Sequence, residues 1–95
     1  MQLVTLDEAK KRLSYESDEM DSDITLMVDS IESYLFFATG VDFANTKNDR
    51  AKRLAKDYVL TALYVQYYNV KDDTLSQARL TAMVKQLQAV AAYEA

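Results

Sequence analysis

Hydrophobic residues recur along most of this chain at the three- and four-residue spacing of amphipathic α-helices. The pattern predicts four helices, at residues 6–13, 22–39, 49–68 and 75–92. The chain contains no proline and one glycine, so it has almost none of the residues that usually mark turns. We therefore expect an all-α fold with short polar links between the helices. At 95 residues the chain should form one small domain, residues 1–95.

Capping residues indicate where these helices begin and end. Thr5 precedes the first helix and Glu8 follows three residues later, which is the pattern of a capping box. Gly40, the one glycine, is expected to end the second helix in the left-handed conformation. The other candidate caps are Asp21, Ser22 or Asp23 for the second helix, Thr46 or Asn48 for the third, and Thr74 with Gln77 for the fourth.

The helix at 22–39 carries two separate uncharged stripes. The stripe expected to face the core consists of Ile24, Met27, Val28, Ile31, Leu35 and Ala38. The stripe on the back of the helix consists of Leu26, Ser30, Ser33 and Phe37. This back stripe is either covered by the first or fourth helix or contacts another subunit, since exposed apolar patches mark interaction surfaces.

The helix at 49–68 has no charged residue between Tyr58 and Tyr68. A helix that is apolar on all sides is expected to be buried on all sides, so we place this helix at the centre of the fold. Its tyrosines are then expected to pack in the core rather than to stack on nucleic-acid bases. The fourth helix presents one apolar stripe, which consists of Leu80, Met83, Val84, Leu87, Val90 and Ala91.

Charge is divided unevenly along a chain whose net charge is −4. Residues 14–46 contain no lysine or arginine, whereas residues 47–56 are strongly basic. The basic cluster could be a solvated face, pair with acids of the same or a neighbouring subunit, or contact the DNA backbone. An acidic chain does not fit a general nucleic-acid binder, which should be basic over a broad face. The acids of residues 14–46 are Glu16, Asp18, Glu19, Asp21, Asp23, Asp29, Glu32 and Asp42, and the bases that follow are Lys47, Arg50, Lys52, Arg53 and Lys56.

The composition argues against several kinds of chemistry. The chain lacks cysteine, which forms thiolate metal sites, and it lacks histidine, which is the commonest general base. A calcium loop that began at Asp21 would place Leu26 where the loop requires glycine. We therefore expect a solvent-exposed loop that caps the following helix instead. Paired carboxylates in a polar segment do not favour a raised pKa. We expect no enzymatic activity, no metal and no cofactor.

Nothing in the sequence indicates a membrane protein. There is no apolar run of about 18 residues, and the N-terminus has no basic-then-apolar signal pattern. We therefore expect a cytoplasmic or virion protein.

Three segments, VTLDEAKKRL, SYESDEMDSDI and ATGVD, together resemble the small all-α head–tail connector (adaptor) proteins of tailed phages. In that family a short helix precedes an acidic stretch and a long helix that closes with a Thr-Gly-like stop. Here those elements are 5–10, 21–24 and Thr39–Gly40. The segment LAKDYVLTALYVQYYN at 54–69 also looks like the family's aromatic-rich helix. The resemblance covers roughly residues 4–70.

The resemblance implies a structural role in the virion. Such proteins form a ring, usually a dodecamer, under the portal protein at the head–tail junction. DNA passes through the ring without sequence-specific binding, and the tail or a head-completion protein docks on it. The protein would be made in the cytoplasm of the bacterial host. The family's C-terminal segment commonly grips the portal, which implies that residues 75–95 do so here, with Leu87 and Val90 as candidate contacts.

A ring uses two different patches of each subunit, and an acidic and a basic patch are suitable halves of such a contact. The runner-up interpretation is a small helical DNA-binding or regulatory protein that uses the basic start of the third helix. The candidate interface residues are Asp18, Glu19, Asp21 and Asp23 of one subunit against Arg50, Lys52 and Arg53 of the next, together with Leu26 and Phe37 of the back stripe.

Overall fold

The computed structural model describes residues 3–68 and 74–94. The α-helices are α1 (Leu6–Leu13), α2 (Asp21–Thr39), α3 (Asp49–Tyr67) and α4 (Thr74–Glu94), and a short 3₁₀ helix, η1 (Phe43–Asn45), lies between α2 and α3. The predicted all-α fold with four α-helices is confirmed, and each predicted bound lies within two residues of the observed one. The sequence pattern did not predict η1.

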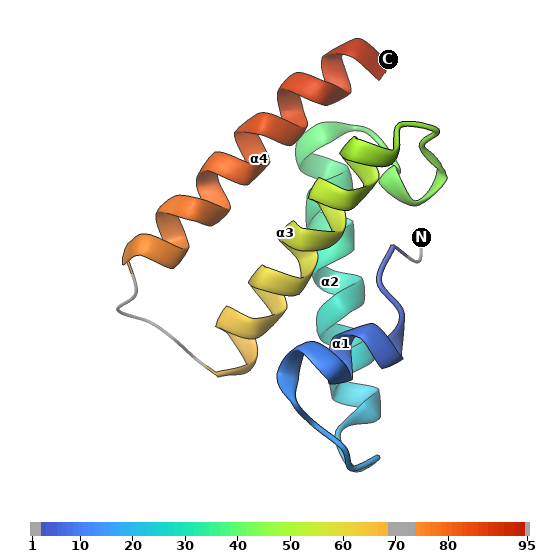
Figure 1. The fold of residues 1–95 in the computed structure, drawn as a ribbon, viewed down its shortest axis with the longest axis vertical. Helices are drawn as coiled ribbons and strands as arrows, with labels where there is room; N and C mark the ends of the chain where they lie inside the picture. The colour runs from blue at the N-terminus through green and yellow to red at the C-terminus, as the bar shows by residue number, and fades with distance from the viewer. Residues whose placement is uncertain (1–2, 69–73, 95) are drawn as a thin grey trace.

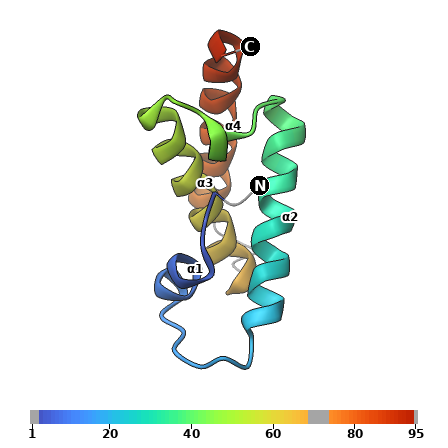
Figure 2. The same cartoon turned by 90° about the vertical axis from the view of Figure 1, so that its right-hand side faces the viewer.

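Helices α1 and α3 lie on one side of the molecule and α2 lies on the other (Figures 1 and 2). Helix α4 packs against both α2 and α3, and α3 also contacts α1 and η1. The molecule measures 40 × 29 × 19 Å, so these two sides are the broad faces of a flat body. The central position predicted for α3 is therefore confirmed, although α2 also contacts the other three α-helices.

The helix ends follow the predicted caps except at α2. The Thr5 hydroxyl accepts a hydrogen bond from the Glu8 N–H at 3.2 Å, and Glu8 Oε1 accepts one from the Thr5 N–H at 3.1 Å. Gly40 ends α2 with a φ of +75°. Asn48 caps α3 by accepting hydrogen bonds from the N–H groups of Arg50 and Ala51.

The cap predicted for α2 is wrong. Met20 occupies the N-cap position and makes no side-chain hydrogen bond there. Asp21 and Asp23 lie inside the first turn instead, where their charges favour the positive end of the helix dipole. The capping box predicted for Thr74 and Gln77 involves the Thr74 side chain, which lies outside the described residues.

The core is built from the predicted apolar stripes. Met27 and Ala38 of α2, and Leu80, Val84 and Val90 of α4, are only partly buried. The other members of both stripes are less than 9% exposed, because helical spacing places them on the side that faces α3. The buried stripe residues are Ile24, Val28, Ile31, Leu35, Met83, Leu87 and Ala91, and they pack with Val59 and Leu63 of α3.

The expectation that α3 is buried on all sides is wrong at its C-terminal end. Tyr58, Val59 and Leu63 are buried, but Tyr64 and Tyr68 are 45% and 48% exposed. A tyrosine can lie at the surface because its ring is apolar and its hydroxyl is polar. The Tyr68 hydroxyl donates a hydrogen bond to the backbone carbonyl of Leu13 at 2.7 Å. The absence of charge in this stretch therefore did not mean burial.

A buried carboxylate holds the N-terminal segment against α2. Glu32 is 3% exposed, its Oε1 accepts a hydrogen bond from the Leu3 N–H at 2.9 Å, and its Oε2 accepts one from the Val4 N–H at 3.1 Å. Leu3 and Val4 are themselves buried. Sequence analysis grouped Glu32 with the acidic patch, whereas the fold places it inside the molecule, where it fixes the segment that leads into α1.

Candidate interaction surfaces

The back stripe of α2 is exposed to solvent. Leu26 and Phe37 are 65% and 85% exposed, so the interpretation that α1 or α4 covers this stripe is wrong. Tyr34, which is 57% exposed, adds a third large side chain that the sequence stripe did not include. We call this surface the α2 face, and it consists of Leu26, Ser30, Ser33, Tyr34 and Phe37.

Acidic residues border the α2 face, and α2 contains no lysine or arginine. Successive residues of a helix are rotated by about 100°, which places Asp29 beyond the Ser33 edge of the face and Asp23 at its N-terminal end, between the angular positions of Ser30 and Tyr34. Both are exposed, and neither forms an ion pair with any part of the chain that the structure describes. The α2 face therefore combines an apolar centre with negatively charged edges.

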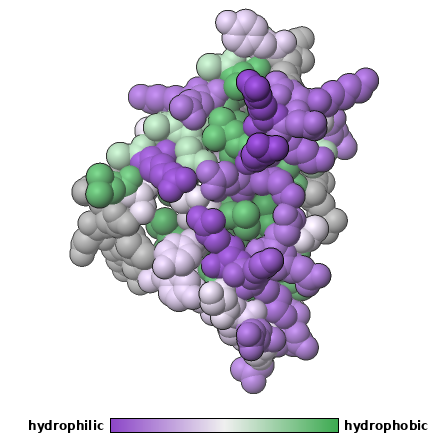
Figure 3. All heavy atoms as spheres, in the orientation of Figure 1, coloured by the Kyte–Doolittle hydropathy of each residue, from purple (hydrophilic) through white to green (hydrophobic). Residues whose placement is uncertain are grey.

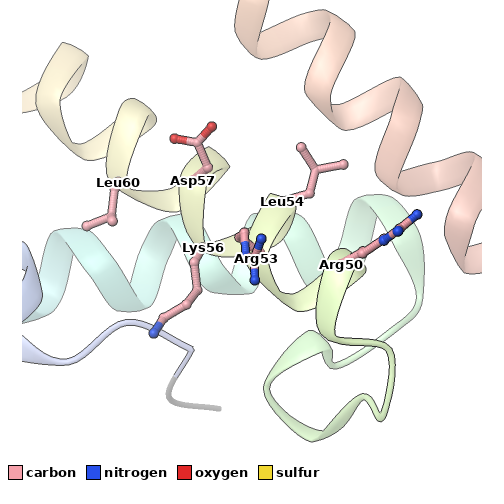
Figure 4. A pocket seen from close by; sticks show the side chains of 6 residues that line it. All are labelled: Arg50, Arg53, Leu54, Lys56, Asp57 and Leu60. Atoms are coloured by element: carbon pink, nitrogen blue, oxygen red, sulfur yellow. The ribbon is translucent and has the colours of Figure 1, made fainter.

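The outward side of α3 carries an open groove of about 530 Å³. Figure 4 shows Lys56 reaching toward the N-terminal segment and α1, where its Nζ lies 2.7 Å from Glu8 Oε2. Arg50 and Arg53 are exposed and have no ion-pair partner within residues 3–68 and 74–94. The groove is lined by Arg50, Arg53, Leu54, Lys56, Asp57 and Leu60.

A second groove, of about 340 Å³, runs between α1 and α3 and shares Leu60 with the first. It is lined by Glu8, Lys11, Arg12 and Leu60, and both basic residues are exposed. Figure 3 shows that hydrophobic patches lie between hydrophilic side chains over this side of the molecule. The two grooves form one surface, which we call the basic face, with Lys11, Arg12, Arg50 and Arg53 around Leu54 and Leu60.

The acidic connector that leads into α2, residues 14–23, is partly neutralised within the chain. Lys10 Nζ lies 3.0 Å from Asp18 Oδ1 and 2.9 Å from Asp21 Oδ1. Both carboxylates raise the pKa of Lys10, and Asp21 contributes more than Asp18. Asp21 Oδ1 is buried and accepts no hydrogen bond of good geometry, so the charge of Lys10 is its main compensation. Of the four acids predicted at the interface, Glu19 and Asp23 therefore remain unpaired.

The salt bridge between α1 and α3 also shifts a pKa. The ammonium of Lys56 and the backbone N–H of Thr5 hold the pKa of Glu8 below its ordinary value. Since Glu8 also completes the capping box, one carboxylate both starts α1 and ties it to α3.

The fold keeps the predicted acidic and basic interface residues apart. The acids lie at the start of α2, whereas α3 begins beyond the other end of α2 (Figures 1 and 2). Nineteen helical residues span roughly 28 Å, so these clusters cannot pair within one chain. Lys52 is rotated by about 200° from Arg50 and does not line the groove.

The predicted portal contacts do not form an exposed surface. Leu87 is fully buried in the core and Val90 is partly buried against it, because the apolar stripe of α4 packs on α2 and α3. In this fold both residues stabilise the bundle, and Leu87 is not accessible to a partner.

Comparison with protein-family models, with curated proteins and with solved structures finds no match. Within residues 3–68 and 74–94, no helix is long and apolar enough to cross a membrane. The same residues contain no group of three or more acidic side chains placed to hold a metal ion.

Proposed function

We propose that this chain is the subunit of a phage head–tail connector. In this proposal it is a structural protein that assembles into a ring below the portal protein and joins the head to the tail. The ring extends the channel through which DNA passes and offers a platform to the tail or to a head-completion protein. Its role is assembly and not catalysis.

The observation that supports this proposal best is a pair of unlike, unpartnered faces on opposite sides of one small domain. The α2 face is apolar with acidic edges, and the basic face has cations around an apolar groove. Two different patches on opposite sides favour head-to-tail contacts between copies, and such contacts produce rings when the rotation closes. The resemblance of residues 4–70 to connector proteins supports the same role.

The exposed apolar side chains support assembly independently of charge. Leu26, Tyr34 and Phe37 lie together on one helix, and each is more than half exposed. Large apolar side chains that are exposed along one helix favour an interaction surface. A subunit that works only inside a ring would keep these residues because its neighbour covers them.

The test is mass photometry and electron microscopy of the concentrated protein, with and without the portal protein of the same phage. We expect rings of uniform size, formed at high protein concentration or on the portal. The variant Leu26→Ser/Phe37→Ser should keep its helical circular dichroism and remain monomeric. Wild-type protein that stays monomeric at every concentration, even with the portal present, contradicts the proposal.

A DNA-binding regulator is the second candidate, and the exposed aromatics favour it. Tyr64 of α3 and Tyr68, the C-cap residue of α3, are about half exposed, and the same helix carries Arg50 and Arg53. Such a regulator should bind duplex DNA with a steep salt dependence, and Arg50→Glu/Arg53→Glu should abolish that binding. A connector should bind duplex DNA weakly, and the same variant should impair ring formation while the helical fold is kept.

A further inference from the structure

We infer that the α2 face of one copy packs on the basic face of the next copy in register, with the long axes of both copies side by side. This inference rests on the proposed function, because it names the surfaces that meet in the ring. It replaces the end-to-end pairing of the acidic connector with the start of α3 that the sequence suggested.

The positions of the charged residues along the long axis of the molecule support a contact in register, in which neighbouring copies are not shifted along that axis. Helix α1 lies beside the first half of α2 in both ribbon views, so Lys11 and Arg12 are level with the acidic half of the α2 face (Figures 1 and 2). If a neighbour stacks on the basic face without sliding along the long axis, its Asp23 and Asp29 meet Lys11 and Arg12. End-to-end pairing would instead require a displacement of roughly 28 Å, the length of α2.

The apolar residues match at the other end of the contact. Phe37 lies near the end of α2, at the height where α3 begins, and it is 85% exposed. Its ring then faces Leu54 and the guanidinium groups of Arg50 and Arg53, which line the groove of the next copy. Arginine over an aromatic ring is a favourable arrangement.

Size and charge both favour a second copy as the occupant. The α2 side measures up to 40 × 29 Å, which leaves room for the about 800 Å² that each partner buries in a typical stable interface. The α2 face offers unpaired acids and no bases, whereas the basic face offers Lys11, Arg12, Arg50 and Arg53 without ion pairs among the described residues.

The test is charge reversal with rescue by mixing. Asp23→Lys/Asp29→Lys makes both faces of a copy basic, and Lys11→Glu/Arg12→Glu makes both faces acidic at the matching height. Each variant alone should need at least a tenfold higher concentration to assemble, because like charges meet in every contact. An equimolar mixture should assemble like the wild type, because each face then meets the opposite charge.

The matched control is Glu16→Lys/Glu19→Lys in the acidic connector, which should assemble normally. Circular dichroism and urea unfolding verify that all three variants fold. The contact in register is wrong if either face variant assembles alone like the wild type. It is also wrong if both variants fold but their mixture fails to assemble. In both cases the proposal of a ring still stands. If the wild type never forms rings, the proposed function itself fails.

A second measurement uses the absence of native cysteine. Ser33→Cys on the α2 face should be joined to Arg53→Cys on the basic face by a short thiol crosslinker when the two variants are mixed. Crosslinking of Ser33→Cys chains to one another would show a symmetric contact between α2 faces and would overturn the inference.

Discussion

Helices α2 and α3 are both 19 residues long and pack against each other, yet they present opposite surfaces to solvent. Helix α2 exposes large apolar side chains and buries a carboxylate, whereas α3 exposes arginines and buries its apolar side. On the outward side of α3, charged side chains that face water surround the partly buried Leu54 and Leu60 of the groove. The outward side of α2 differs, because it exposes Leu26, Tyr34 and Phe37 to solvent. The difference shows that two helices of equal length in one small domain can present opposite kinds of surface to solvent.

The largest effect should come from the carboxylate that α2 buries. Glu32→Ala removes the acceptor of the Leu3 and Val4 N–H groups, and each unsatisfied buried donor costs about 1–3 kcal/mol. The free energy of unfolding, measured with urea, should fall by about that amount for each of the two groups. Glu32→Gln should lose roughly half as much, because it keeps one oxygen acceptor.

The control for this prediction is the buried polar residue of α3. The Thr61 hydroxyl lies 3.5 Å from Asp57 Oδ1, at the limit of a hydrogen bond, so Thr61→Val should cost less than about 1 kcal/mol. If Glu32→Ala is as mild as Thr61→Val, the N-terminal segment does not depend on the carboxylate.

The second comparison places the same substitution on the two helices. Leu63→Ala in α3 opens a cavity at a fully buried site and should lower the free energy of unfolding by about 2–5 kcal/mol. Leu26→Ala on the α2 face should change it by less than about 0.5 kcal/mol in dilute protein. Assembly should show the reverse order: Leu26→Ala should impair it more than Leu63→Ala. Sedimentation or mass photometry measures this at a temperature where both variants remain folded. An equal loss of stability in the two variants would mean that Leu26 is covered within the monomer.

The third comparison concerns how the helices begin. Asn48→Ala removes the side-chain cap of α3 and should cost about 1 kcal/mol. Ser22→Ala in the first turn of α2 should be neutral within about 0.5 kcal/mol, because Ser22 makes no cap. Thermal or urea unfolding followed by circular dichroism measures both, and a clear loss from Ser22→Ala would restore the sequence-based cap.

The smallest effect depends on pH and involves the ion pair that joins α1 to α3. The folded-state pKa of Glu8 is lowered, so its contribution is present above the ordinary value of 4.5 and is lost as the pH falls through the lowered value. Glu8→Gln keeps the capping box and removes the charge. The variant should be less stable than the wild type by about 0.2–1 kcal/mol at pH 7, and this difference should vanish in acid. A constant difference at all pH values would exclude the ion pair as its cause.

The candidate surfaces were partly visible in the sequence. Leu26 and Phe37 stood out because they share an uncharged stripe on a helix whose other side is also apolar. Arg50 and Arg53 stood out because they belong to the strongly basic residues 47–56. Tyr34 was missed, because it lies one position from Ser33 and falls outside the stripe. Lys11 and Arg12 were missed as interface candidates because they complement the dipole of α1, which gave them a sufficient local role.

The sequence by itself determined the helices, most of their ends and their core sides, because periodicity and capping act over a few residues. Thr5 with Glu8, Gly40 and Asn48 needed no knowledge of the rest of the chain. Only the tertiary structure decided which charges are free. The fold brings Lys10 to Asp18 and Asp21, buries Glu32 against the N-terminal segment, and separates the acidic connector from Arg50 by the length of α2. Such outcomes depend on how helices pack in space, and the local pattern of a chain does not record that arrangement.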